Sequence, residues 1–192
     1  MGHGPERTRS ADDARHDFDF FFGSWRQANR KRVKPLVQGD TEWVEFQSYT
    51  EAGPILGGLG NIDTFKAPQL PGRPGFEGFT LRLVEPETGL WRIWWASTIS
   101  NGQLEPPVIG RFRDGIGLFE CDDVIDGVPV RVRFTWKDIT VDSATWEQSF
   151  SFDNGATWDT NWITRHTRVT NEPPDESDLD TFPPTSSLPT GA

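Results

Sequence analysis

Apolar and polar residues alternate in short runs along most of the chain, and these runs are rich in Val, Ile, Thr, Phe and Trp. In one of them Val130, Val132 and Phe134 occupy every second position. Successive residues of a strand point to opposite faces, so this pattern predicts a β-strand with one apolar face. Almost no segment has a helical period. We therefore expect a nearly all-β protein.

Turn residues separate the alternating runs at regular intervals, and glycine marks six of the turns. These are Gln38-Gly39-Asp40, Thr88-Gly89, Asn101-Gly102, Asp114-Gly115, Asp126-Gly127 and Asn154-Gly155. Such sequences are typical of β-hairpin turns. They predict about ten strands, at 24–34, 41–51, 57–66, 76–85, 89–98, 107–113, 115–123, 128–137, 143–152 and 158–169. A closed antiparallel up-and-down barrel is favoured because closure leaves no exposed edge, and a barrel of this size has room for a ligand.

Both ends of the chain differ from this pattern. Residues 1–16 are polar without periodicity, and residues 171–192 combine acidic and Ser/Thr residues with two Pro-Pro pairs. Such compositions are typical of disorder. We expect a disordered N-terminal tail over 1–16, a barrel domain over 17–170 and a disordered, acidic, Pro-rich tail over 171–192.

Composition narrows the function classes. The 29 acidic and 19 basic side chains give a net charge of −10, which argues against nucleic acid as a partner. No apolar stretch approaches the roughly 20 residues that span a bilayer, and no signal-peptide core is visible, so we expect a cytoplasmic, soluble protein that binds no membrane. One cysteine, Cys121, and three histidines are too few for a disulfide framework or a Cys-rich zinc site. We expect no metal and no resident cofactor, and a homodimer is compatible with the sequence.

The same alternation predicts the lining of the lumen. The side chains expected to face inward are Val130, Val132, Phe134, Trp136, Trp146, Gln148, Phe150, Phe152, Trp91, Ile93, Trp95, Phe79, Leu81 and Leu83. This lining is strongly aromatic.

Several polar residues share these inward positions. By parity they are Gln27 and Asn29 after Trp25, Glu45, Gln47 and Tyr49 after Trp43, and Gln148, Thr164 and His166 around Trp162. A buried polar group costs several kcal/mol, in the range of about 2–7, unless something bonds to it. These residues therefore outline a polar strip that a ligand could contact. A slip of one residue would turn any strand inside out, and the pattern defines the register of strand 41–51 least well.

The segment DFDFFFGSW, which ends in Gly23-Ser24-Trp25, resembles the Gly-x-Trp signature of the calycin superfamily, which includes lipocalins and fatty-acid-binding proteins. Further segments, LWRIWWAS, PPVIGRF, DGIGLFECDD, VRFTW and ATWEQSFSFDNGATWDTNW, are similar to an uncharacterised bacterial calycin-like family classed as a domain of unknown function. The similarity covers about residues 17–170. It implies a lipocalin-like barrel and no established reaction.

The resemblance also implies a closed end. In calycins the signature tryptophan packs beneath an arginine of the last strand, which here are Trp25 and Arg168. The phenylalanines between Phe18 and Phe22 are expected to form a short helical plug at the same end.

His166 stands where the family is expected to carry an apolar residue. A buried imidazole can act as a general base, a hydrogen-bond donor or a metal ligand. Nitrobindins, which are also calycin-like barrels, ligate haem through a histidine on the final strand, so haem binding through His166 is a hypothesis. The glycine-rich continuation of the nitrobindin motif is missing after Trp25. A histidine satisfied by a neighbour such as Gln148 or Asn29 is the alternative.

Two functions follow from this interpretation. The first is binding of a small, mostly apolar or aromatic ligand in the lumen, with contacts from Gln27, Asn29, Trp43, Gln47, Trp95, Trp136, Trp146, Gln148, Trp162 and Thr164. The second is an isomerase or cyclase of an aromatic or polyketide-like metabolite, with His166, Glu45 or Tyr49 as acid or base. A scaffold whose barrel is simply filled by aromatic side chains is the third interpretation.

Overall fold

The computed structural model describes residues 14–170. The predicted C-terminal tail, 171–192, lies outside the described residues, as does all but residues 14–16 of the predicted N-terminal tail. The elements are η1 (Asp19–Phe21), β1 (Gly23–Arg32), β2 (Trp43–Ile55), η2 (Leu56–Gly58), β3 (Gly60–Ala67), β4 (Phe76–Glu85), β5 (Leu90–Ser97), β6 (Val108–Arg113), β7 (Ile116–Ile125), β8 (Val128–Lys137), β9 (Ser143–Ser151) and β10 (Asp159–Arg168).

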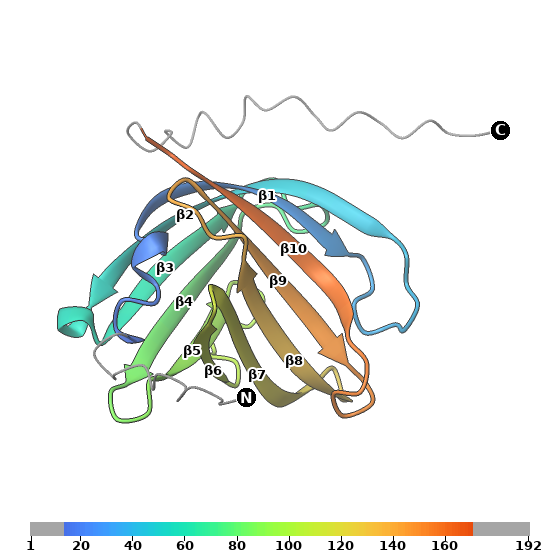
Figure 1. Ribbon diagram of the computed structural model, residues 1–192. Coiled ribbons are helices and arrows are strands. Elements are labelled where there is room, and N and C mark those ends of the chain that lie inside the picture. Colours follow the sequence, from blue (N-terminus) through green and yellow to red (C-terminus); the bar gives the residue numbers. More distant parts are fainter. Residues whose placement is uncertain (1–13, 171–192) are drawn as a thin grey trace, which may run out of the picture.

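The ten strands close into one antiparallel barrel in which every strand pairs with its neighbour in sequence and β1 pairs with β10 (Figure 1). The predicted ten-strand closed barrel is confirmed, and most predicted strand ends lie within two residues of the observed ones. Glycine turns set the hairpins as expected. At two of them Asp114-Gly115 and Asp126-Gly127 have φ values of 50° and 78°, and of 50° and 80°. Two successive positive φ values are typical of the type I′ turn that joins adjacent strands.

One seam of the barrel is much shorter than the others. β5 and β6 pair only from Trp91–Gly110 to Ile93–Val108. β5 continues to Ser97, and the loop 98–107 runs back beside it, held by a hydrogen bond from the Glu105 N–H to the Trp95 carbonyl at 2.8 Å. The β5–β6 loop therefore takes the place of strand pairing at this edge.

The expected N-terminal helical plug is not observed as such. The segment before β1 forms only a three-residue 3-10 turn, Asp19–Phe21. Phe18 and Phe21 are nonetheless buried, at 0% and 2% exposure. A single turn suffices because the hydrogen bond from the Phe21 N–H to the Phe18 carbonyl holds the backbone so that both rings enter the barrel.

The predicted inward face of β2 is wrong. Glu45 and Gln47 are exposed, and the inward positions are Phe46, Ser48 and Thr50. Because parity is shared along a strand, Trp43 and Tyr49 belong to the outer face with Glu45.

Outer-face partners explain this register. The guanidinium groups of Arg30 and Arg32 lie 4.7 and 4.6 Å from the centroid of the Trp43 ring. The Tyr49 hydroxyl donates to Glu51 at 3.0 Å. Tyr49 is buried by its neighbours on the outer surface, so its low exposure does not place it in the lumen.

The predicted inward face of β4 is also wrong. Gly78, Thr80 and Arg82 face the lumen, whereas Phe79 is 37% exposed on the outer surface, with Leu81 and Leu83 on its face. The inward glycine leaves room for a neighbouring ring, because a Cβ at Gly78 would lie 2.0 Å from the Trp95 ring. On β5, β8, β9 and β10 the predicted inward faces are confirmed by burial of Trp91, Trp136, Phe150 and Trp162.

Candidate functional site at the open end of the barrel

The end of the barrel where β1 begins is sealed. Trp25 has no exposure, and its indole N–H donates to the Phe21 carbonyl at 2.7 Å. The Arg168 guanidinium lies 4.2 Å from the centroid of the Trp25 ring and donates to the carbonyls of Phe22 and Val141. The predicted pair of Trp25 and Arg168 is confirmed, and the first turn and the β8–β9 hairpin are tied together through it.

His166 lies inside this sealed end. Its ring centroid is 5.3 Å from that of Phe21, 6.0 Å from Trp25 and 5.1 Å from Trp136. Nδ1 lies 3.3 Å from the carbonyl oxygen of Ala144, which can only accept, so Nδ1 carries the hydrogen. Burial lowers the His166 pKa to about 3, and the nearby positive charge of Arg82 acts in the same direction. The imidazole is therefore neutral.

This environment does not fit haem. The imidazole is enclosed by three aromatic rings and is 4% exposed, and neither pocket described below is lined by His166. An axial ligand needs an open face toward the porphyrin, which the packing of Phe21 and Trp136 fills. The residues around His166 therefore do not fit haem ligation.

An ion pair that the sequence did not reveal lies in the same chamber. Arg82 on β4 pairs with Asp63 on β3, and both side chains are 5% exposed. Asn61 accepts a second hydrogen bond from Arg82 at 3.0 Å, and Thr80 donates to Asp63 at 3.1 Å. The guanidinium also lies 5.1 Å from the Phe18 ring centroid. The sequence carried one sign of this ion pair. Asn61 and Asp63 on one strand, and Thr80 and Arg82 on the next, occupy alternate positions and so share a face.

The predicted polar strip on β1 and β10 exists, and it is satisfied internally. The Asn29 side-chain carbonyl accepts from the Trp162 indole at 3.1 Å and from the Thr164 hydroxyl at 2.9 Å. Its amide donates to Ser48 at 2.7 Å, and Ser48 donates to Gln27 at 2.6 Å. A closed network of this kind orients Trp162 and fixes the register between strands.

Pockets occur at the opposite, open end of the barrel. One, of about 30 Å³, lies under the β5–β6 loop and is called here the lumen pocket. It is lined by Ile93, Trp95, Glu105, Pro106, Val108, Cys121, Asp123, Ile125, Val132, Phe134, Gln148 and Phe150. The other, of about 230 Å³, is called the rim pocket. It is lined by Gln38, Gly39, Phe150, Phe152, Asp153, Thr157, Trp158 and Asp159. The two pockets share Phe150.

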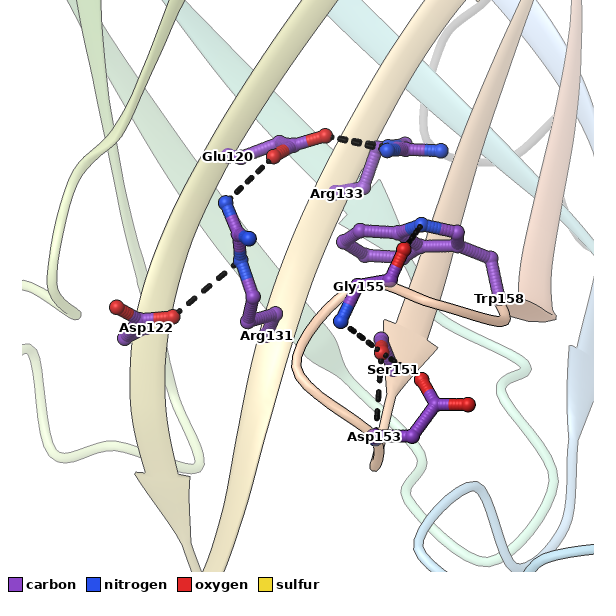
Figure 2. Close-up of polar contacts among 8 residues, drawn as sticks. All are labelled: Glu120, Asp122, Arg131, Arg133, Ser151, Asp153, Gly155 and Trp158. Atoms are coloured by element: carbon purple, nitrogen blue, oxygen red, sulfur yellow. Dashed lines mark hydrogen bonds and ion pairs between the residues drawn. The ribbon is translucent and has the colours of Figure 1, made fainter.

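The β9–β10 turn contributes Asp153 and Trp158 to the lining of the rim pocket. Figure 2 shows these two residues among the polar contacts of the turn. Asp153 accepts from the Ser151 hydroxyl at 2.8 Å and from the Thr157 hydroxyl at 2.6 Å, and the Gly155 N–H donates to Ser151 at 2.7 Å. Bonds from Thr157 and Ser151 lower the Asp153 pKa to about 2. The carboxylate is thus a fixed structural element of this turn.

The outer surface holds this turn in place. Arg133 on β8 lies 3.6 Å from the centroid of the Trp158 ring, and its guanidinium bonds to Glu120 on β7 (Figure 2). Arg131 joins the same carboxylate at 2.9 Å. Two strands, β7 and β8, therefore position Trp158 at the rim.

Charge is concentrated where the lumen opens. Lys31 follows Gln27 and Asn29 on the inner face of β1, and its ammonium lies 3.8 Å from the centroid of the Trp162 ring. Burial, followed by repulsion from Arg73, lowers the Lys31 pKa to about 8. Partial desolvation raises the Glu105 pKa, with Asp123 adding repulsion and Lys31 opposing it, although Glu105 as a whole is an exposed residue of the loop. Burial also raises the pKa of the Cys121 thiol to about 12, so the sulfur is protonated and unreactive.

The structure separates the predicted site residues into three groups. Trp95 and Gln148 line the lumen pocket, and Trp146 and Trp162 pack together beside it, with ring centroids 5.6 Å apart. Gln27, Asn29, Thr164, Trp136 and His166 lie deeper. Trp43, Glu45, Gln47 and Tyr49 lie on the outer face. The expected acid–base set of His166, Glu45 and Tyr49 is thus divided between the two sides of the wall.

Residues 14–170 contain neither a metal-binding cluster nor a membrane-spanning helix. No group of three His, Cys, Asp or Glu side chains there could hold a metal ion. None of the helical segments in that range is long and apolar enough to cross a membrane.

Comparison with known proteins supports the fold. No protein-family model matches the chain, and no curated protein matches it in sequence. The crystal structure of Rv2717c from M. tuberculosis is similar with a TM-score of 0.58 and 12% identity, over 81% of this chain and 97% of that one. The S-type phycobiliprotein lyase CPES from Guillardia theta is similar with a TM-score of 0.55 and 10% identity, over 88% and 100%. Both are calycin-like ten-strand barrels, so the likeness shows a calycin-like fold. Membership of the specific bacterial family stays a prediction.

Proposed function

We propose that the protein binds a small, mostly apolar or aromatic molecule at the open end of its barrel. The observation that carries the proposal is the position of Phe150, which lines both the rim pocket and the lumen pocket. Movement of this one ring would join the two spaces. Apolar and aromatic walls with a few polar groups are typical of small-molecule sites.

The two ends of the barrel differ in a way that supports this location. Phe18 and Phe21 fill the closed end, and we propose that they prevent a ligand from entering there. The β5–β6 loop covers the open end, and its Leu104 is 52% exposed. The two strands that it joins, β5 and β6, pair over only a short stretch. A ligand would enter here by displacing the loop from the lumen pocket.

Size and polarity limit the ligand. The rim pocket, at about 230 Å³, is smaller than the roughly 300–1,000 Å³ of typical ligand sites, which favours a molecule of one or two rings. Gln148 and Glu105 provide polar contacts at the lumen pocket. A protein of the same fold, CPES, is a phycobiliprotein lyase, which supports a functional barrel without indicating the ligand of this chain.

Binding can be tested with cinnamyl alcohol as the first probe, by tryptophan fluorescence and by the shift in melting temperature. We expect saturable quenching and a rise in melting temperature that grows with probe concentration. Cys121→Leu places extra carbon in the lumen pocket and should weaken binding at least about tenfold. Leu118→Phe enlarges the outer face of the same strand and serves as the matched control. Equal binding by both variants would contradict the proposed location.

A further inference from the structure

Lys31 stands at a defined position relative to the lumen pocket. On β1 it is paired with Trp162 of β10, and Trp162 is paired with Gln148 of β9. Adjacent strands lie about 4.8 Å apart, so Lys31 is about 10 Å along the inner wall from Gln148, which lines the pocket. The lumen pocket alone, at about 30 Å³, has room for only one or two waters, so a molecule of one or two rings would span this distance once movement of Phe150 joins the two pockets.

The amine of Lys31 is held without an ion pair. Its nitrogen faces the Trp162 ring at 3.8 Å, and that ring is itself fixed by the bond from its indole N–H to Asn29. In the described part of the chain no carboxylate lies within ion-pair distance of this amine, whereas Lys137 is bound to Glu147 at 2.7 Å. The amine is therefore positioned but not neutralised.

Its surroundings also make the unprotonated form more accessible. Burial and the Arg73 guanidinium lower the Lys31 pKa to about 8, so about a tenth of the amine is free at pH 7 and about half at pH 8. A free amine in an apolar site is the nucleophile used in imine formation. Glu105 lies close enough to interact electrostatically with Lys31, and its charge opposes part of this lowering.

We propose that Lys31 captures a carbonyl-bearing ligand, a small aromatic or apolar aldehyde or ketone, as a reversible imine at the open end of the barrel. This inference rests on the proposed ligand site and adds the chemical class of the ligand. The Trp162 ring that faces the ammonium would equally face the cationic product.

The step balances without an oxidant or reductant. The nitrogen lone pair of Lys31 attacks the carbonyl carbon, a C–N bond forms, and one N–H proton moves to the oxygen to give a carbinolamine. A proton from solvent at the open end moves to the hydroxyl group, the C–O bond breaks and water leaves. The product is an iminium cation on Lys31 near the Glu105 carboxylate, and addition of water with loss of that proton reverses the step.

The test uses the full chain and cinnamaldehyde, with sodium cyanoborohydride to reduce the imine to a stable amine. The chain has four lysines, Lys31, Lys34, Lys66 and Lys137, so peptide mass mapping can assign the adduct. We expect labelling of Lys31 at least about tenfold faster than that of the other three lysines, rising with pH to a midpoint near 8. Lys31→Arg keeps the charge and should abolish the fast labelling, and Lys34→Arg is the matched control that should keep it.

A second variant tests the electrostatic setting of the amine. Glu105→Gln should lower the midpoint of labelling, because Glu105 raises the Lys31 pKa, and should leave the rate above the midpoint unchanged. An unchanged midpoint would show that the labelled amine is not the one that Glu105 influences, and would overturn the assignment of the fast labelling to Lys31.

Cinnamyl alcohol separates this inference from the proposed function, since it has the same body and no carbonyl. If the alcohol binds but Lys31 reacts no faster than Lys34, the imine is overturned and the binding site stands. If neither probe binds and no lysine reacts selectively, both proposals are overturned.

Discussion

The two ends of the barrel are built from similar residues and do different things. At the closed end Phe21 stacks on Trp25, Phe18 packs against Trp91, and Arg168 donates to backbone carbonyls. At the open end Trp162 faces a lysine that has no carboxylate partner in the described residues. Aromatic content alone therefore does not indicate a ligand site. What distinguishes the open end is polar groups that the fold leaves without strong partners.

Loops account for much of this difference. The closed end is sealed by tight hairpins and two 3-10 turns, η1 and η2, which leave few degrees of freedom. The open end is covered by longer connections, including 98–107, whose residues 101–106 are exposed. Connections of this kind open with a low free-energy cost and carry binding sites more often than the strands they join.

The largest expected effect tests the closed end. Trp25→Ala should lower the free energy of unfolding by about 3–5 kcal/mol, because a fully buried aromatic side chain is lost and a cavity remains. Leu104→Ala, at the exposed open end, should change it by less than about 0.5 kcal/mol. Urea titration of both variants measures the difference. A loss below about 1 kcal/mol for Trp25→Ala would show that this end is not the rigid one.

The second effect concerns the buried ion pair beneath the closed end. Asp63→Leu leaves the Arg82 charge buried and unpaired, and should cost about 3 kcal/mol or more. The double variant Asp63→Leu with Arg82→Met removes both charges and should recover much of that loss. The parent, Asp63→Leu, Arg82→Met and the double variant form a double-mutant cycle, measured by urea unfolding. Additive losses would show that the two side chains do not act as a pair.

The third effect is the pH dependence that His166 gives to the closed end. Its folded pKa, about 3, lies below its ordinary value of 6.5, so the unfolded chain binds the proton more readily and stability falls as the pH drops below about 6.5. Between pH 7 and pH 5 the loss should be about 2 kcal/mol. His166→Phe should remove this part of the acid limb. An identical acid limb in the variant and the parent would contradict burial of a neutral imidazole.

The sequence predicts the strands well because turns and alternation are local. Hairpin residues such as Asp126-Gly127 and the inward set on β8 could be identified without any knowledge of neighbouring strands. The Gly-x-Trp segment likewise indicated the pairing of Trp25 with Arg168. Fold and closed end are therefore largely predictable.

The errors arise where burial depends on a partner from another strand. Rules of alternation place Leu81 and Leu83 inside and Arg82 outside, but Arg82 is stabilised in the lumen by Asp63, 19 residues earlier. On β2 the buried side is chosen by Ser48 and Thr50, which bond to Gln27. A rule that treats each strand separately cannot detect such pairs.

The open end was the least predictable part. Its lumen pocket is formed where Glu105 and Pro106 of one loop meet side chains of five strands. Loop paths carry no periodic pattern, so no feature of 98–107 in the sequence indicated that it covers the lumen. Lys31 was not among the predicted site residues, although its inward position follows from the same parity that correctly placed Asn29.

The smallest expected effect returns to the open end and to Lys31. Its folded pKa of about 8 lies below the ordinary value of 10.5, so between these values the unfolded chain binds more protons and the contribution of Lys31 to stability rises with pH. Because Lys31 is partly exposed, this gain should reach only about 1 kcal/mol at pH 9 relative to pH 7, less than a fully buried amine would give. Lys31→Met should lack it, whereas Lys34→Met, which lies in the adjacent exposed turn, should keep it. Thermal unfolding of the three proteins at both pH values gives the comparison. If Lys31→Met gains as much stability as the parent, Lys31 is an ordinary solvated lysine, and the contrast between the two ends loses its electrostatic basis.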